Sequence, residues 1–296
     1  MSDTLAAPYV TLPPTQAELP CDDGIPMETQ RHKYQMDLLI ETLELWLGQR
    51  EDGFVSGNMF VYYSMAQVRN KDFKGPDFFV VLGVPKGERR SWVVWEEGKA
   101  PDVVIELLSE STAEADKNEK KLIYQNQMRV PEYFWFDPFN PDDWAGFSIQ
   151  QGVYQPLVPN ERNQLVSQSL GLGLQRSQGN YRGVETVLLR WATLDGELLP
   201  TGAEIAQQEH QRAEQERQRA EQERQRAEQE HQRAEQERQR AEQERQRAEQ
   251  ERQRAEQVQS QLQQTVRNLL QTGMTAEQVA KLTGLDVSQV EELDDR

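Results

Sequence analysis

Cysteine and histidine are scarce in this sequence, and their scarcity excludes several kinds of protein. The 296 residues include one cysteine, Cys21, and three histidines, of which His32 alone lies outside a C-terminal repeat. One cysteine can neither form an internal disulfide nor complete a cysteine-based zinc site. Chemistry built on a histidine general base is also unexpected, and we interpret His32 as an ordinary residue on the polar face of a helix.

Long apolar runs are absent as well. No stretch approaches the roughly 18 apolar residues that a membrane-spanning helix needs. The first ten residues, MSDTLAAPYV, also lack the basic stretch and apolar run of a secretory signal. We therefore expect a cytoplasmic protein with no membrane association.

Basic residues are in the minority. The chain carries 33 Lys and Arg against 50 Asp and Glu, which gives a formal net charge of -17. Tight non-specific binding to nucleic acid depends on Lys and Arg contacts with phosphate, so this balance argues against it. An enzyme that reaches phosphate through a metal ion stays compatible with an acidic chain.

Composition divides the chain into four parts. Residues 1–27 contain five prolines and few apolar residues, which indicates an extended arm. Residues 28–200 carry the apolar periodicities of an α/β domain. A long charged helix is predicted for residues 204–271, and a helical hairpin tail for residues 272–296.

The first half of the α/β domain begins with a helix and continues with strands. Apolar residues recur at spacings of three and four up to Leu47, which predicts a helix over 29–47 with Thr29 as N-cap and Gly48 at its end. Short apolar runs predict strands near residue 60, at 78–84 and at 92–95.

Residues 101–138 predict a strand, a helix and a second strand parallel to the first. The strands cover 103–108 and 133–136. Ser111 and Glu114 form the S-x-x-E pattern of a capping box, so the helix should run from there to about Met128, with Leu122 and Ile123 facing inward. Further short strands over 147–199 complete a mixed sheet with helices packed against it.

Acidic and polar residues interrupt this apolar architecture at a few positions. Asp77 stands at the head of a buried strand, and Glu106 lies in the middle of another. Asp116, Lys120 and Tyr124 follow at i, i+4 and i+8, so they share one face of the next helix. A carboxylate inside a buried strand is costly unless it is paired or binds a metal, and Glu106 therefore needs an explanation.

Metal-assisted phosphodiester hydrolysis fits these residues. Neighbouring strands lie about 4.8 Å apart, so Asp77 and Glu106 can converge on one Mg²⁺, or on Mn²⁺ in its place. A nearby lysine can orient the attacking water. Asp102 lies about 13 Å from Glu106 along the strand, too far to share the ion, and Glu41 could approach it only through water. Glu106 could instead be an internal salt-bridge partner of Lys120.

At these residues the sequence resembles the Uma-type restriction endonuclease family of the PD-(D/E)xK nuclease superfamily. The resemblance spans roughly residues 20–200 and rests on four segments: GPD at 75–77, APDVVIELLSEST at 100–112, D-x-x-x-K-x-x-x-Y at 116–124 and VPEYFWFDP at 130–138. It implies a restriction-endonuclease-like mixed sheet flanked by helices and Mg²⁺-dependent cleavage of DNA.

The resemblance also implies roles for single residues. Asp77 and Glu106 correspond to the two acids, and the backbone carbonyl of Leu107 to an additional metal ligand. The superfamily places its lysine where this chain has Leu108. Lys120 matches the lysine that the Uma-type family keeps on the following helix, and the neighbouring Lys121 is the alternative.

The C-terminal repeat predicts a long helix. A seven-residue unit, [H/R]QRAEQE, recurs from His210 to Gln257 without glycine or proline. Each unit has one apolar residue, so both a coiled coil and a single solvated helix stay possible. Apolar residues from Val258 to Leu270 form a stripe suited to oligomerisation. Two short helices should follow, the first capped by Thr275 and Gln278.

Two functional hypotheses follow. The first is a homo-oligomeric endonuclease that acts on DNA, with RNA as a substrate not excluded. The alternative is an inactive nuclease-fold scaffold protein that oligomerises through its C-terminal helix. Neither hypothesis specifies the sequence or structure of the nucleic acid.

Overall fold

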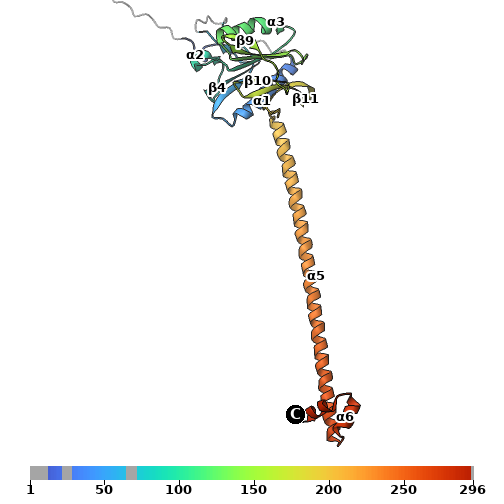
Figure 1. Cartoon of the computed structure of the whole chain (residues 1–296). Helices are drawn as coiled ribbons and strands as arrows, with labels where there is room; N and C mark the ends of the chain where they lie inside the picture. The colour runs from blue at the N-terminus through green and yellow to red at the C-terminus, as the bar shows by residue number, and fades with distance from the viewer. Residues whose placement is uncertain (1–12, 22–28, 65–71, 295–296) are drawn as a thin grey trace, which may run out of the picture. The chain divides into compact units, whose positions relative to one another are not determined.

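The chain forms two compact units, Met1–His210 and Gln211–Arg296 (Figure 1). The computed structural model describes residues 13–21, 29–64 and 72–294. Within these residues no helix has the length and apolar character needed to cross a membrane. The first unit contains all the strands described and the candidate site.

A six-stranded mixed sheet forms the centre of the first unit. Strands β6 and β7 run parallel, and the other neighbouring strands of this sheet run antiparallel. This confirms the predicted α/β class and the parallel strand pair. The strands, in spatial order, are β1 (Asp52–Ser56), β4 (Phe78–Pro85), β6 (Val103–Leu107), β7 (Glu132–Phe136), β8 (Trp144–Gln150) and β9 (Val153–Pro156).

Two smaller sheets accompany the central one. The first contains β10 (Gln164–Ser167), β11 (Leu172–Tyr181) and β12 (Val184–Ala192), and the second contains β3 (Phe73–Lys74), β2 (Val61–Tyr62) and β5 (Trp92–Val93). The strand predicted at 92–95 is only half correct. It ends at Val93, and the short helix α2 (Val94–Glu97) follows, where the Trp95 indole donates a hydrogen bond to the Pro14 carbonyl at 2.9 Å.

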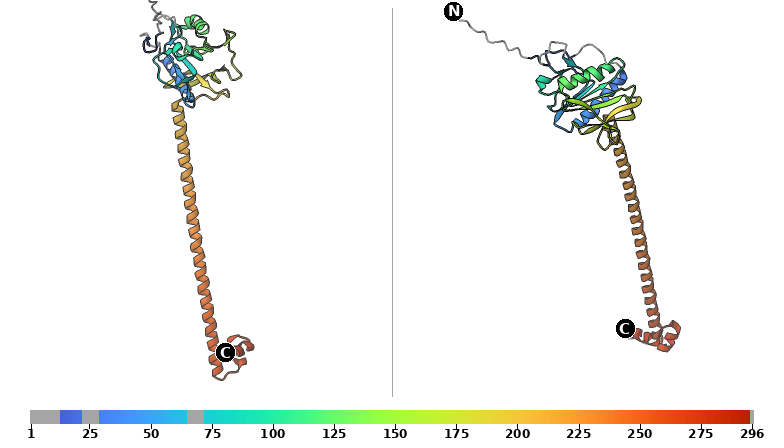
Figure 2. Two further views of the ribbon diagram at one scale, coloured as in Figure 1. Left: turned by 90° about the vertical axis from the view of Figure 1, so that its left-hand side faces the viewer. Right: turned by 45° about the horizontal axis from the view of Figure 1, so that its top comes forward.

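Helix α1 (Gln30–Leu47) covers one face of the central sheet, as its apolar periodicity predicts (Figure 2). The Thr29 hydroxyl accepts the His32 N–H at 3.3 Å and caps the helix, and the Gly48 N–H bonds back to the Glu44 carbonyl at its end. Leu39 and Leu43 are completely buried, and each contributes about 2 kcal/mol of hydrophobic stabilisation.

The opposite face of the sheet is covered by the helix that connects β6 to β7. Its segments are α3 (Ala113–Ala115), the π-helical η1 (Asp116–Lys120), α4 (Lys121–Ile123) and the π-helical η2 (Tyr124–Met128). The helix ends at Met128 as predicted. The N-cap differs from the prediction by one residue: it is Thr112 in place of Ser111, Thr112 makes no side-chain capping bond, and the Ser109 hydroxyl accepts the Thr112 N–H at 3.2 Å.

The prediction that Leu122 faces inward is wrong: Leu122 is 54% exposed. At about 100° per residue Leu122 lies about 160° around the helix from Tyr124. The face that turns Tyr124 toward the sheet therefore turns Leu122 to solvent, and Tyr124, Gln125 and Met128 are the buried residues of this segment. Ile123 is partly buried against that core.

The described part of the expected N-terminal arm packs on the first unit. Leu19 is 3% exposed and lies in a cluster with Phe60, Tyr62 and Val93. The Tyr62 hydroxyl donates a hydrogen bond to the Pro20 carbonyl at 2.6 Å. The rest of the expected arm, residues 1–12 and 22–27, lies outside the described residues.

The repeat lies within a single helix, α5 (Gly202–Gln271), and its residues are exposed. Helices α6 (Ala276–Thr283) and α7 (Val287–Asp294) follow, and Thr275 and Gln278 form the predicted capping box. Val266 is fully buried in a small core with Val279 and Val290. Part of the stripe that we assign to oligomerisation is therefore used within the second unit, while Val258 is 63% exposed.

Candidate active site

The two acids lie side by side on neighbouring strands. Asp77 immediately precedes β4, and the pairing of Phe78 with Ile105 places it next to Glu106 on β6. The Asp77 N–H donates to Oε2 of Glu106 at 3.4 Å, and the Leu107 N–H donates to Oδ2 of Asp77 at 2.7 Å. Glu106 has no exposed surface, whereas Asp77 is partly exposed. The acids thus hold each other in place through the backbone.

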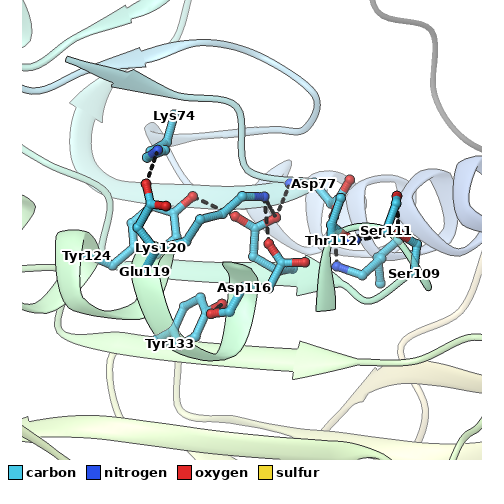
Figure 3. A network of polar contacts seen from close by, with 12 residues as sticks. Lys74, Asp77, Ser109, Ser111, Thr112, Asp116, Glu119, Lys120, Tyr124 and Tyr133 are labelled. Atoms are coloured by element: carbon cyan, nitrogen blue, oxygen red, sulfur yellow. Dashed lines mark hydrogen bonds and ion pairs between the residues drawn. The ribbon is translucent and has the colours of Figure 1, made fainter. Parts of the chain in front are cut away.

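The helix after β6 brings Lys120 and Tyr124, both labelled in Figure 3, to Glu106. The Lys120 Nζ lies 3.4 Å from Oε2 of Glu106 and 2.6 Å from Oδ1 of Asp116. The Tyr124 hydroxyl donates to Oε1 of Glu106 at 2.6 Å. Lys120 and Tyr124 therefore contact Glu106 directly, and Asp116 joins them through Lys120, in agreement with the helix face that their spacing of four residues predicts.

Asp116 is the second buried carboxylate of the cluster, after Glu106. It is 1% exposed, and neither of its oxygens has a hydrogen-bond partner in the described chain apart from the ion pair with Lys120. The Tyr133 hydroxyl donates to the Asp116 backbone carbonyl at 2.8 Å and anchors this turn. Three carboxylates thus share one lysine, which leaves an excess of negative charge in a buried place.

The pKa values of the three acids reflect burial first and this excess of negative charge second. Burial raises the pKa of Glu106 to about 7, with Lys120 opposing the shift and Asp77 adding to it. Burial likewise raises the pKa of Asp77 and of Asp116 to about 6. Burial alone would lower the pKa of Lys120, but the Glu106 and Asp116 carboxylates outweigh it and raise that pKa.

A cation would relieve the same excess, so the donor set fits a hard divalent ion. Among the residues that the structure describes, no group of three or more Asp, Glu, His and Cys side chains is placed to hold a metal. An ion here would be held by two carboxylates together with backbone, water or substrate oxygens. Mg²⁺ is commonly bound in this way.

Three other sequence candidates lie outside this cluster. The Lys121 ammonium lies 3.5 Å from the centre of the Phe147 ring, so the structure places Lys120 and not Lys121 at the acids. Asp102 accepts the Leu82 N–H at 2.7 Å and pairs with a lysine at 2.8 Å. Glu41 accepts hydrogen bonds from the Tyr181 hydroxyl and the Gly202 N–H instead of approaching the acids.

The interpretation of His32 as a polar-face residue is wrong. His32 is 4% exposed, its Nε2 lies 2.9 Å from the Leu108 carbonyl oxygen, and its Nδ1 lies 2.8 Å from the Thr29 hydroxyl. Because a carbonyl only accepts, Nε2 carries the proton. His32 lies four residues before Met36 and so extends the apolar stripe of α1, which is the signal that could have placed it inside.

Sequence reasoning also missed a polar rim around the acids. Lys74 pairs with Glu119 at 3.3 Å beside Lys120, and the Ser109 hydroxyl lies 2.9 Å from that of Thr112 at the end of β6 (Figure 3). The run of hydroxyl residues directly after a buried strand was the available signal.

Comparison with known proteins adds an independent observation. Residues 7–185, more than half of the chain, match the model of the Uma2 family, which is described as "Putative restriction endonuclease". A solved structure of a "putative nuclease belonging to DUF820" from Anabaena variabilis ATCC 29413 is similar, with 16% identity and a TM-score of 0.37 over 53% of this chain and 90% of the other. No curated protein matches the chain.

Proposed function

The chain belongs to the Uma2 family of restriction-endonuclease-type proteins, and we propose that it is a Mg²⁺-dependent endonuclease that hydrolyses phosphodiester bonds of DNA. The observation that carries the proposal is the convergence of Asp77, Glu106 and Lys120 from two strands and a helix. Two acids can hold a metal ion that polarises phosphate and activates water, and a lysine beside them can stabilise the charge of the transition state.

The site offers three groups whose oxygen atoms would hold the ion. The Asp77 and Glu106 carboxylates and the backbone carbonyl of Leu107 are the proposed ligands. A bound Mg²⁺, or Mn²⁺ in its place, would polarise the phosphate and lower the pKa of water. The ligand role of the Leu107 carbonyl rests on the family pattern rather than on a measured contact.

The other side chains of the cluster have roles that do not depend on the ion. Lys120 can donate to the attacking water or to a phosphate oxygen, and the negative charge around it keeps it protonated. Asp116 fixes the Lys120 ammonium through their 2.6 Å ion pair. Tyr124 orients the Glu106 carboxylate through the hydrogen bond from its hydroxyl.

Cleavage of plasmid DNA tests the proposal. Wild type with Mg²⁺ or Mn²⁺ should cut the plasmid, whereas Asp77→Asn, Glu106→Gln and Lys120→Ala should each be slower by about 100-fold or more. Lys121→Ala is the matched control, because it removes the same charge one residue away and should retain activity. Cleavage by Asp77→Asn, Glu106→Gln and Lys120→Ala at the wild-type rate would refute the assigned site. Labelled RNA in the same assay decides between the two nucleic acids.

A second function is supported by the same contacts. Glu106 is already paired with Lys120 and Tyr124, so an internal ion pair could preserve the fold after activity is lost. The chain would then be an inactive scaffold protein. Absence of cleavage of both DNA and RNA with either metal would favour this alternative.

A further inference from the structure

An exposed aromatic residue with an arginine stacked on it lies near the candidate site. Phe139, in the loop after β7, is 56% exposed. The guanidinium carbon of Arg31, in the first turn of α1, lies 4.4 Å from the centre of the Phe139 ring. We call this pair the Arg31–Phe139 platform.

The platform lies beyond the carboxyl ends of two neighbouring strands, β7, which leads to Phe139, and β6, which carries Glu106. Because β6 and β7 are parallel and Leu107 is opposite Phe136, Phe139 lies just beyond the carboxyl ends of both strands. His32, next to Arg31 in the chain, bonds to the Leu108 carbonyl, and its ring centre lies 5.6 Å from that of Phe139. The carboxyl ends of parallel strands are where ligands generally bind in α/β sheets.

Hydrogen bonds hold the loop that presents Phe139. The Asp137 carboxylate accepts the N–H groups of Phe139 at 2.7 Å and of Asn140 at 3.0 Å. At the other end of the loop, Asp143 pairs with Lys117 at 2.6 Å. The exposed position of Phe139 is thus built into the loop, and a partner could use it without paying to order it.

Arg31 differs from the other arginines that stack on aromatic rings. Those in the described residues are each paired with a carboxylate, namely Arg50, Arg89, Arg176 and Arg182. Arg31 has no carboxylate partner within the described chain. It also lies in a helix first turn without acidic residues, where the helix dipole disfavours a cation. Its stacking on Phe139 contributes modestly to stability but leaves its charge without a carboxylate partner among the described residues, and an anionic ligand would supply an opposite charge.

We propose that the Arg31–Phe139 platform is a nucleic-acid contact, in which Arg31 binds a backbone phosphate and Phe139 packs against the adjoining sugar or base. The choice of partner rests on the proposed function. A planar guanidinium suits phosphate, and an exposed ring suits the apolar faces of nucleotides. The platform would thereby supply the local attraction to DNA that the net charge of -17 does not.

Binding of the full chain to labelled duplex DNA, measured by fluorescence anisotropy in EDTA over a range of salt concentrations, tests this inference. Arg31→Ala should weaken binding about tenfold and reduce the magnitude of the salt slope by about 0.9, the value for one phosphate contact. Phe139→Ala should weaken binding with less change in the slope. Arg31→Lys should keep the slope and lose part of the affinity.

Arg50→Ala is the matched control. Arg50 follows the other end of α1, roughly 25 Å away along the helix axis, and it also stacks on a ring, that of Trp46 at 5.8 Å. Its removal changes the net charge equally and should leave both affinity and slope unchanged. Thermal unfolding of each variant checks that the fold is retained.

The outcomes separate this inference from the proposed function. Equal effects of Arg31→Ala and Arg50→Ala, or no DNA binding by the wild type, would overturn the platform as a nucleic-acid contact. Binding that depends on Arg31 in a protein that never cleaves would support the contact and reject the endonuclease. Cleavage by a protein whose DNA binding does not depend on Arg31 would support the endonuclease and reject the contact.

Discussion

Glu106 is fully buried beside two other acids, so its charge state couples to stability. Its pKa is raised from 4.5 to about 7 by burial, with Lys120 opposing. Between these two pH values the native state holds a proton that the unfolded chain has released. The unfolding free energy of the metal-free protein should therefore fall as pH rises through this window.

Chemical denaturation in EDTA at pH 5 and pH 8 measures this effect. We expect the wild type to lose on the order of 1 kcal/mol or more between these pH values relative to Glu106→Gln, which cannot titrate. Asp77 and Asp116 remain in both proteins and contribute to both profiles. Parallel pH profiles for the two proteins would show that Glu106 titrates normally in the fold.

The sequence is informative about single residues where a residue conflicts with its surroundings. Glu106 stands in an apolar strand, so its need for partners can be predicted before any partner is known. The contacts of His32 and Asp102 could not be predicted in this way. Their partners are the backbone groups of Leu108 and Leu82, which the residues around them in the sequence do not reveal. Contacts of this kind depend on how distant segments meet, which local patterns do not contain.

Secondary-structure elements were predictable where one periodicity holds throughout. Helix α1 follows from its apolar spacing, and the parallel pair β6 and β7 follows from the strand, helix and strand that succeed one another over residues 101–138. The helix between those strands keeps its predicted end, but Leu122 points outward because it lies opposite the face that carries Lys120 and Tyr124 to Glu106. Both π segments begin at residues of the acid cluster, Asp116 and Tyr124, so the irregularity lies where side chains must reach Glu106.

The N-cap of α1 gives a prediction at this scale. The Thr29 hydroxyl caps the helix and also contacts Nδ1 of His32, so Thr29→Ala should lower the unfolding free energy by about 1 kcal/mol. Thr29→Ser keeps the hydroxyl and should unfold like the wild type. The measurement is urea denaturation of both variants, and equal stability of Thr29→Ala and wild type would contradict the capping role.

For the whole molecule, the formal charge of -17 is unevenly distributed. The repeat contributes 12 Arg and 13 Glu, so most of the excess belongs to the first unit. Duplex DNA would be repelled by this field at low salt. Arg31, which has no carboxylate partner among the described residues, and a metal ion at the acids are two local ways to counter that repulsion.

We also propose that the chain is a homo-oligomer through its C-terminal helix. Val266 is buried within the second unit, so the apolar surface left for association is centred on the exposed Val258. Val258→Asp should convert the oligomer to a monomer in sedimentation equilibrium. Gln259→Asp adds a carboxylate at the next position and should leave the oligomer intact. A wild-type chain that sediments as a monomer would exclude the proposal.

The exposure of the repeat has an evolutionary consequence. No side chain from His210 to Gln257 is buried, so gain or loss of one heptad changes no packed contact in either unit. Each heptad adds about 10 Å of helix and turns the next residue by only about 20°. The fold therefore constrains the number of heptads much less than it constrains the positions of Asp77, Glu106 and Lys120, which contacts hold in place.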